Sequence, residues 1–440
     1  MMRRHGRMVA MIAGWAMLAS PVAAQLLPRG GLGTGPVGSL TGGLLGSNDP
    51  SHAPLALGGL TGGLDAVGGS LRSLSPADLL TARRDRLRAL IHDNRAVLDR
   101  DGDGNPIRRD EILATALSPA TLAKAEQQGF SVKRRETVEA LGLDIVVLAP
   151  PKNMPARDAI DRLHALDPQA DFALNHVYEP AFAALQPTAG GSAGGSAGEA
   201  SMGLIDGGVG AHPAFAGATV EQRGFAGAVK PSGHGTAVAS LMVGRAGAFR
   251  GVAPGGALLA ADVYGGSEAN GSAEAIVQAM GWLASRGVHV INISLVGAPN
   301  PLLAAGIRVL QSKGVLVVAA VGNDGPAAPP QYPASYPGVI AVTGVDARGK
   351  VLIEAGRASH LDFAAPGADM AGAVPGGRWE TLRGTSFAAP LVAASLAMID
   401  KGDPRRALAE LAAAAKPAPK LGHGIVCGSC ATPPRAVGLK

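Results

Sequence analysis

Residues 203–209 read Gly-Leu-Ile-Asp-Gly-Gly-Val, a short apolar run that ends in an acid followed by two glycines. Similar apolar runs return at residues 257–263, 288–294, 315–321 and 339–342, and helical patterns separate them around residues 234–244, 272–286, 300–313 and 386–399. Continuous apolar strands that alternate with helices predict a largely parallel sheet covered on both faces. We therefore expect an α/β domain over residues 201–415, with its active site at the C-terminal edge of the sheet.

Further motifs in this domain carry nucleophilic chemistry. Residues 233–239 (Gly-His-Gly-Thr-Ala-Val-Ala) place His234 at the start of a helix, and residues 384–390 (Gly-Thr-Ser-Phe-Ala-Ala-Pro) do the same for Ser386. A serine hydroxyl is a weak nucleophile, so it needs a histidine to accept its proton and an acid to hold that histidine. Each motif alone also fits a cap or a turn. Together, in this order, they predict Asp206, His234 and Ser386 as a catalytic triad.

These motifs resemble those of the subtilisin-like serine protease (subtilase) family, and the resemblance extends from about residue 202 to 400. It implies a subtilisin-like fold and a serine endopeptidase that needs no cofactor. Residues 318–325 (Val-Ala-Ala-Val-Gly-Asn-Asp-Gly) are similar to the family segment that carries the oxyanion-hole asparagine, which implies this role for Asn323. A side-chain amide suits this role because its N–H donates a hydrogen bond to the oxyanion of the tetrahedral intermediate.

Residues 291–297 (Ile-Asn-Ile-Ser-Leu-Val-Gly) resemble the family strand that pairs with the substrate backbone. The resemblance implies substrate-binding roles for Ser294, Leu295, Val296 and Gly297. The chain departs from the family at Val296, where a glycine is common. We expect this branched side chain to narrow the cleft or the primary specificity pocket.

Residues 76–185 have ordinary mixed composition and predict a small α+β domain. Helices are expected at 76–94, 118–128 and 156–166, and a strand at 144–148. The position of this domain resembles that of a family propeptide, which implies an intramolecular inhibitor and folding aid whose strand-like end, residues 171–178, lies in the active site. An independent binding module is the alternative. The Gly/Ser/Ala tract at 186–200 predicts a flexible, protease-accessible linker.

The beginning of the chain has the layout of a secretory signal peptide over residues 1–24, with a basic start, an apolar stretch and small residues before the expected cleavage site. We therefore expect export to a periplasm or the medium. An uncleaved membrane anchor is the alternative, although the apolar run is shorter than the roughly 20 residues that span a bilayer. Residues 25–75 repeat Gly-Gly-Leu with almost no charge and predict a flexible segment.

The chain has 2 cysteines, Cys427 and Cys430, in the tail at 416–440. For an exported protein they predict a local disulfide, with free or redox-active thiols and a metal site as alternatives. Residues 99–104 (Asp-Arg-Asp-Gly-Asp-Gly) have the acidic spacing of a calcium loop. Pro106 and Asp110 depart from that pattern, so we expect a polar turn and no metal.

The charge pattern limits the partners. The formal net charge is +5, but no block of Lys and Arg with interleaved aromatics follows the basic start, so nucleic-acid binding has little support. Peptide substrates and the chain's own upstream domain are the expected partners. Two other functions stay open: a non-catalytic binding protein whose cleft is blocked by the upstream domain, and a transpeptidase or esterase that uses the same triad.

Overall fold

The computed structural model describes residues 74–180 and 202–440, all of which belong to one compact unit. We call residues 74–180 the upstream region and residues 202–440 the main domain. The expected signal peptide, almost all of the Gly-rich segment and the linker at 186–200 lie outside the described residues. In the part that is described, no helix is both long and apolar enough to cross a membrane.

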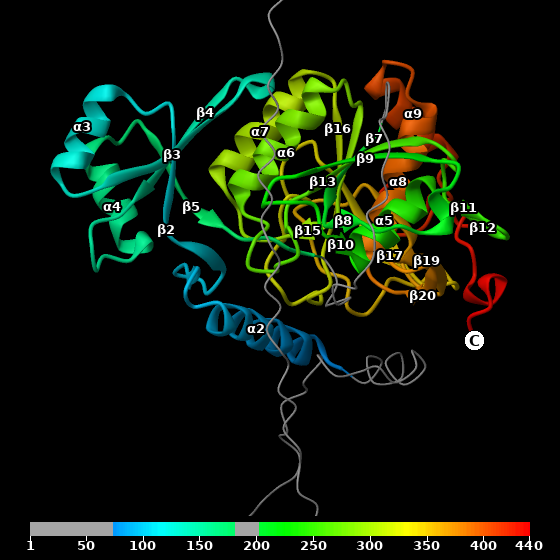
Figure 1. Ribbon diagram of the computed structural model, residues 1–440. Helices are drawn as coiled ribbons and strands as arrows, with labels where there is room; N and C mark the ends of the chain where they lie inside the picture. Colours follow the sequence, from blue (N-terminus) through cyan, green and yellow to red (C-terminus); the bar gives the residue numbers. More distant parts are fainter. Residues whose placement is uncertain (1–73, 181–201) are drawn as a thin grey trace, which may run out of the picture. The chain divides into compact units, whose positions relative to one another are not determined.

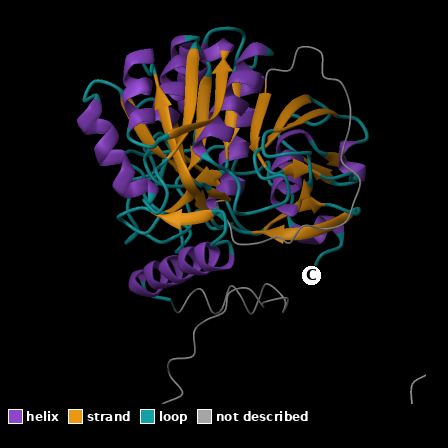
Figure 2. Cartoon of the chain, turned by 60° about the vertical axis from the view of Figure 1, so that its left-hand side comes forward, coloured by secondary structure: helices purple, strands orange, loops and turns teal. Residues whose placement is uncertain are grey.

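The main domain is built on a 7-stranded sheet in which every neighbouring pair is parallel, as the apolar runs predicted. Figures 1 and 2 show helices packed on both sides of its strands. In spatial order the strands are β18 (Phe363–Pro366), β17 (Ile340–Val345), β16 (Leu316–Ala320), β14 (Val290–Ile293), β7 (Met202–Asp206), β13 (Ala257–Asp262) and β9 (Thr219–Gly224).

Alternate residues of the central strands enter separate hydrophobic cores. Leu204 joins the core under α5 (Gly233–Val243) and α8 (Thr385–Ile399), together with α9 (Pro404–Ala414). Its neighbour Ile205 joins the opposite core, under α6 (Ala273–Ser285) and α7 (Pro301–Ser312). Because side chains alternate along a strand, one continuous apolar run supplies both cores.

Short elements complete the main domain. The 3₁₀ helices there are η4 (Pro213–Phe215) and η5 (Pro434–Val437). The small paired strands are β8 (Gly208–Val209) with β10 (Pro231–Ser232), β11 (Arg245–Ala246) with β12 (Phe249–Arg250), and β19 (Met370–Val374) with β20 (Arg378–Leu382). β8 continues directly from β7, so the turn after Asp206 is held against the segment that leads into α5.

The upstream region contains an antiparallel sheet and the helices that its sequence predicted. The helices are α2 (Pro76–Asp93), α3 (Pro119–Gln127), α4 (Ala156–Leu166) and the short η3 (Glu139–Leu141). The strands are β1 (Leu98–Arg100), β2 (Pro106–Thr115), β4 (Leu143–Ala149) and β3 (Ser131–Val138) in spatial order, with β5 (Asp171–His176) also paired to β2. Ser75 and Ser118 cap α2 and α3 through their side chains.

The two faces of the upstream sheet have different partners. One face forms a core with α3 and α4 that includes Ile112 and Leu148. The other face sends Leu113 and Val147 into the same core as α6 and α7 of the main domain. The upstream region is therefore packed against the main domain by a shared apolar core.

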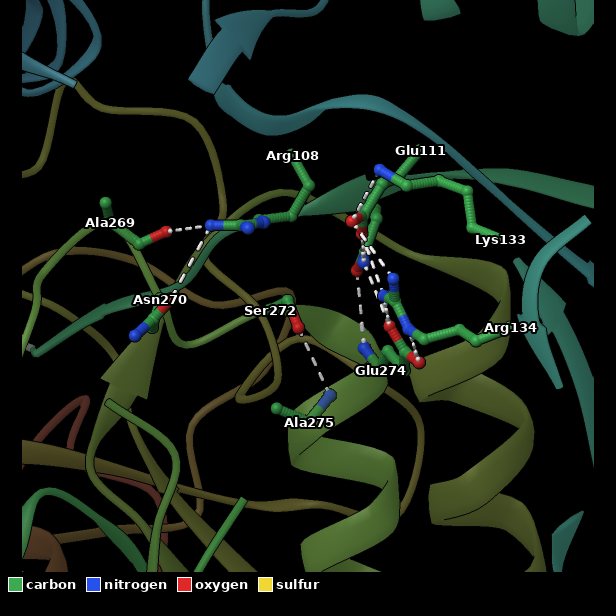
Figure 3. Close-up of polar contacts among 10 residues, drawn as sticks. Arg108, Glu111, Lys133, Arg134, Ala269, Asn270, Ser272, Glu274 and Ala275 are labelled. Atoms are coloured by element: carbon green, nitrogen blue, oxygen red, sulfur yellow. Dashed lines mark hydrogen bonds and ion pairs between the residues drawn. The ribbon is translucent and has the colours of Figure 1, made fainter. Parts of the chain in front are cut away.

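A buried ionic cluster borders this shared core (Figure 3). Arg134 on β3 donates to Glu111 on β2 at 3.1 and 2.9 Å and to Glu274, in the first turn of α6, at 2.8 Å through Nε. Glu111 and Glu274 are each 4% exposed. Burial alone raises the pKa of Glu111, but hydrogen bonds and charge from Arg134, with Asn175 and Lys133, hold it at about 2. The cluster thus pairs the two regions through ion pairs whose carboxylates are buried.

Candidate active site

The structure brings Asp206 and His234 into direct contact. His234 Nδ1 lies 2.9 Å from both carboxylate oxygens of Asp206, and the two residues are 4% and 1% exposed. The Gly207 N–H donates to Asp206 Oδ1 at 2.7 Å and fixes the carboxylate. A Cβ at Gly235 would lie 2.1 Å from the Gly207 carbonyl oxygen, so only glycine allows α5 to approach the turn after β7.

Ser386 lies in the first turn of α8 and is fully buried. The first N–H groups of a helix have no carbonyl partner within it, so the N–H of Ser386 is available to a ligand. Pro390 lies inside the same helix, and a proline has no N–H to donate to the carbonyl four residues earlier. The carbonyl of Ser386 instead accepts the Ser294 hydroxyl at 2.9 Å. Ser294 therefore supports the backbone of Ser386.

Asn323 is oriented by the start of α8. Its Oδ1 accepts the Thr385 N–H at 2.9 Å, which leaves Nδ2 as the free end of the amide. An oxyanion-hole donor has to be held in this way, because it must face the reacting carbonyl before any charge develops there.

Three polar atoms of the residues that the sequence predicted for this site share one property. Within the described residues, His234 Nε2, Ser386 Oγ and Asn323 Nδ2 are buried and have no hydrogen-bond partner. The His234 ring lies 5.4 Å, centroid to centroid, from Phe387, the residue after Ser386. Buried polar groups are nearly always paired, so unpaired groups that gather at one place are expected to serve a bound ligand. Hydrogen bonds between catalytic groups often tighten only when the substrate binds.

The substrate-like strand comes from the chain itself. β6 (Glu179–Pro180) at the end of the upstream region pairs antiparallel with β15 (Leu295–Val296), with Pro180 opposite Leu295 and Glu179 opposite Val296. The strand therefore occupies the segment that the sequence singled out for binding peptide backbone.

Tyr178 precedes this strand and ties it to the main domain. Its side chain is fully buried, and its hydroxyl donates to the Ala298 carbonyl at 2.6 Å. The Tyr178 N–H donates to the Gly271 carbonyl at 2.9 Å, and the Tyr178 carbonyl accepts the Tyr264 hydroxyl at 2.8 Å. A Cβ at Gly297 would lie 2.6 Å from the tyrosine ring, so this glycine makes room for it. Burial of a side chain of this size contributes roughly 1.5–3 kcal/mol.

Val296 is 4% exposed, and its Cγ1 would lie 3.4 Å from a Cβ at Gly322. The branched side chain thus fills space beside the backbone that leads to Asn323.

Asp262 pairs in register with Asp206 on the next strand. Its carboxylate accepts N–H groups from Lys230, Tyr264 and Gly265, which gives it a loop-capping role.

The sequence did not reveal a set of contacts made by α2. Arg83 Nε lies 3.0 Å and Arg86 Nη2 2.8 Å from the carboxylate of Asp324, the residue after Asn323. Arg86 Nη2 also lies 3.3 Å from Glu179 Oε2 on β6. The two arginines lie more than two hundred residues before Asp324, so no short sequence pattern joins them. The one sequence signal for these contacts is that an acidic residue follows Asn323.

Cys427 and Cys430 are joined in a disulfide. In the loop with calcium-like spacing, the Asp101 carboxylate accepts the N–H groups of Asp103 and Asn105, as in a polar turn. Its Oδ2 lies 3.3 Å from His176 Nε2. Over residues 74–180 and 202–440, no group of three or more His, Cys, Asp or Glu side chains is arranged to hold a metal ion.

Solved structures share the fold. Fervidolysin from Fervidobacterium pennivorans, a keratinolytic enzyme related to subtilisin, aligns with a TM-score of 0.58 at 20% identity over 73% of this chain and 60% of its own. An epidermin leader peptide processing serine protease from Staphylococcus aureus aligns with a TM-score of 0.56 at 18% identity over 72% of this chain and 96% of its own. The subtilisin-like fold expected from the sequence is confirmed.

Sequence comparisons point to the same family. Subtilisin Savinase from Lederbergia lenta is 37% identical over 177 residues, which are 39% of this chain and 65% of that protein. An alkaline protease from Alkalihalobacillus alcalophilus is also 37% identical over 177 residues, but these are only 46% of its length. The chain therefore spans between about half and two thirds of the length of these relatives. The subtilase family model matches residues 199–416. Over these residues the chain belongs to the subtilase family of serine proteases.

Proposed function

We propose that this protein is an exported serine endopeptidase with Asp206, His234 and Ser386 as its catalytic triad. The observation that carries the proposal is the convergence of three buried and unpartnered polar atoms, His234 Nε2, Ser386 Oγ and Asn323 Nδ2, beside a strand that binds a peptide segment. The family match supports the same class of reaction.

In the proposed reaction, a substrate peptide lies along β15 as an added antiparallel strand. His234 Nε2 takes the proton of the Ser386 hydroxyl while its oxygen attacks the substrate carbonyl carbon. Asp206 holds the Nδ1–H tautomer and stabilises the imidazolium. Asn323 Nδ2 and the Ser386 N–H donate to the oxyanion. The imidazolium then protonates the leaving amine, and water releases the acyl group from Ser386 by the same steps in reverse order.

We also propose that the upstream region keeps this site blocked until it is removed. Its Tyr178 and β6 segment occupy the cleft in the direction of an antiparallel peptide, and the Arg134 cluster binds it to α6. A folded, packed inhibitor explains why the interface combines a shared apolar core with buried ion pairs. Export is consistent with the expected leader, and a local disulfide suits an oxidising compartment.

The test compares matched serine variants of one helix. Ser386→Ala is expected to abolish peptide hydrolysis while leaving thermal unfolding unchanged. Ser395→Ala, also on α8, removes a hydroxyl that only bonds back to the Leu391 carbonyl, and it is expected to keep activity. Equal hydrolysis by the Ser386→Ala variant would remove the proposed nucleophile. Hydrolysis by neither variant nor the parent chain, even after the upstream region has been cut away, would favour the non-catalytic binding protein.

A further inference from the structure

The positive charge of the main domain is concentrated in residues 401–440, which we call the C-terminal extension. Residues 202–400 contain 12 Lys and Arg and 12 Asp and Glu, so their formal charges cancel. The C-terminal extension contains 7 Lys and Arg against 2 Asp and Glu. All of its basic side chains are exposed: Lys401, Arg405, Arg406, Lys416, Lys420, Arg435 and Lys440. Figure 1 shows this cationic segment running from α9 to the C-terminus along one side of the main domain.

Most of these cations have no acidic partner. Arg406 pairs with Glu410 on the exposed side of α9 at 2.7 Å. The other six make no ion pair within residues 74–180 and 202–440. Because their charge is not neutralised by a carboxylate nearby, it is available to attract an anionic surface within about a Debye length, roughly 10 Å at 0.1 M salt.

An open apolar groove of about 360 Å³ lies between the end of α8, the end of α9 and residues 426–427. Met398 in the last turn of α8 lines this groove and is 62% exposed, more than any other large apolar side chain in the described part of the chain. Lys416 follows the groove residue Ala415, and its backbone pairs with Ile425. The groove therefore adjoins the cationic surface directly.

The groove lies at the opposite end of the helix that carries Ser386. Ser386 is in the first turn of α8 and Met398 is in the last. A rise of 1.5 Å per residue separates them by about 18 Å along the helix axis. A large surface bound at the groove would therefore leave the peptide cleft at the other end of α8 open.

We propose that the C-terminal extension and the adjoining groove form a docking surface for an anionic phospholipid bilayer. Met398 enters the interface between headgroups and acyl chains, and the basic side chains lie beside the headgroups. Charge complementarity carries this choice, because cations on α9, on the loop after it and near the C-terminus suit an extended anionic plane. The groove has little to orient a peptide, since the one hydroxyl in its lining, that of Ser395, already donates to the Leu391 carbonyl.

The experiment uses the Ser386→Ala chain without residues 1–24, because the expected leader is itself apolar and the substitution prevents the proposed self-cleavage. Binding is measured by sedimentation with sucrose-loaded vesicles of phosphatidylcholine alone or with about 30% phosphatidylglycerol. At roughly 0.1 M salt we expect the partition coefficient to be at least about tenfold higher for the anionic vesicles. At roughly 0.5 M salt this preference should largely disappear.

Paired substitutions test the two parts of the surface. Arg405→Gln with Lys416→Gln should lower binding to the anionic vesicles by about tenfold or more. Met398→Ser should lower it by about threefold or more through lost apolar contact. The matched control, Arg308→Gln with Lys313→Gln, removes an exposed arginine and lysine from α7 and its C-cap, on the opposite face of the sheet, and should bind as the parent does. Because all five side chains are exposed, the melting temperatures should match.

Equal binding to neutral and anionic vesicles would overturn the proposal. An equal loss in the control variant would also overturn it, because net charge alone would then explain binding. Tighter binding to a poly-glutamate peptide than to the anionic vesicles would replace the bilayer by an acidic protein partner and overturn it as well. Since the chain used carries Ser386→Ala throughout, none of these results bears on the proposed peptidase function.

Discussion

Substitutions of Asn323 separate its two hydrogen bonds. Nδ2 is the proposed donor to the oxyanion, and Oδ1 accepts the N–H of Thr385, which is fully buried. Asn323→Asp keeps an acceptor for Thr385 but loses the donor. Asn323→Ala loses both. Loss of one oxyanion donor typically lowers kcat by about 10²–10³, or roughly 2.7–4 kcal/mol of transition-state stabilisation. A buried N–H without a partner costs about 1–3 kcal/mol of folding free energy.

Both variants should therefore lose at least about 10²-fold in kcat, with KM nearly unchanged. Only Asn323→Ala should also unfold at a lower temperature, by about 2–4 °C for each kcal/mol in a domain of this size. The assays are steady-state hydrolysis of one peptide and thermal unfolding followed by circular dichroism. An Asn323→Asp variant with kcat close to that of the parent would refute the oxyanion assignment. Equal melting temperatures for the two variants would refute the proposed positioning bond to Thr385.

Other predictions concern the triad, processing and pH. Asp206→Asn should lower kcat by roughly 10⁴, because the imidazole then loses its required tautomer. The measurement is kcat as a function of pH, and a fall in kcat of only a few fold would contradict this prediction. Self-cleavage should fall between Ala181 and Phe182, one residue beyond the strand paired with β15; N-terminal sequencing would find Phe182 first, and a start elsewhere would contradict the register. The pKa of Glu111 is lowered to about 2, so its stabilising contribution is complete above its ordinary value near 4.5 and is lost as pH falls through about 2. The difference in melting temperature between Ser386→Ala and the same chain with Glu111→Gln should thus shrink toward pH 2, and a constant difference would contradict the prediction.

Much of the proposed catalytic arrangement could be predicted because it is encoded locally. The turn after Asp206 needs glycine at 207, and the close approach of α5 needs glycine at 235, so both motifs carry their own geometric reason. The central strands were predictable because they are buried on both faces and therefore continuously apolar. Residues 171–178 were expected to lie in the active site, but residues 171–176 form β5 and pair with β2, and the segment that pairs with β15 is the following β6.

Other features depended on contacts that no short pattern contains. The edge strand β9 reads Thr-Val-Glu-Gln-Arg-Gly, which is too polar to be recognised as a strand of a buried sheet. β3 alternates exposed and half-buried residues, and their partners differ: Val132 packs against the core with α3 and α4, whereas Arg134 meets Glu274 of the main domain. The role of Pro390 emerges only when Ser294, between β14 and β15, is seen to bond to the carbonyl that the proline leaves free. The pairing of α2 with Asp324 joins residues that are distant in sequence, so tertiary packing alone reveals it.

The central claim is that Ser386 is an assembled nucleophile. The most direct measurement treats the purified chain with a fluorophosphonate probe and identifies the labelled peptide by mass spectrometry, beside the Ser386→Ala variant and after proteolytic removal of the upstream region. The account predicts one labelled serine, Ser386, with faster labelling once β6 has left the cleft and no labelling in the variant. Labelling that is absent from the cleaved chain, or that persists in Ser386→Ala, would contradict it.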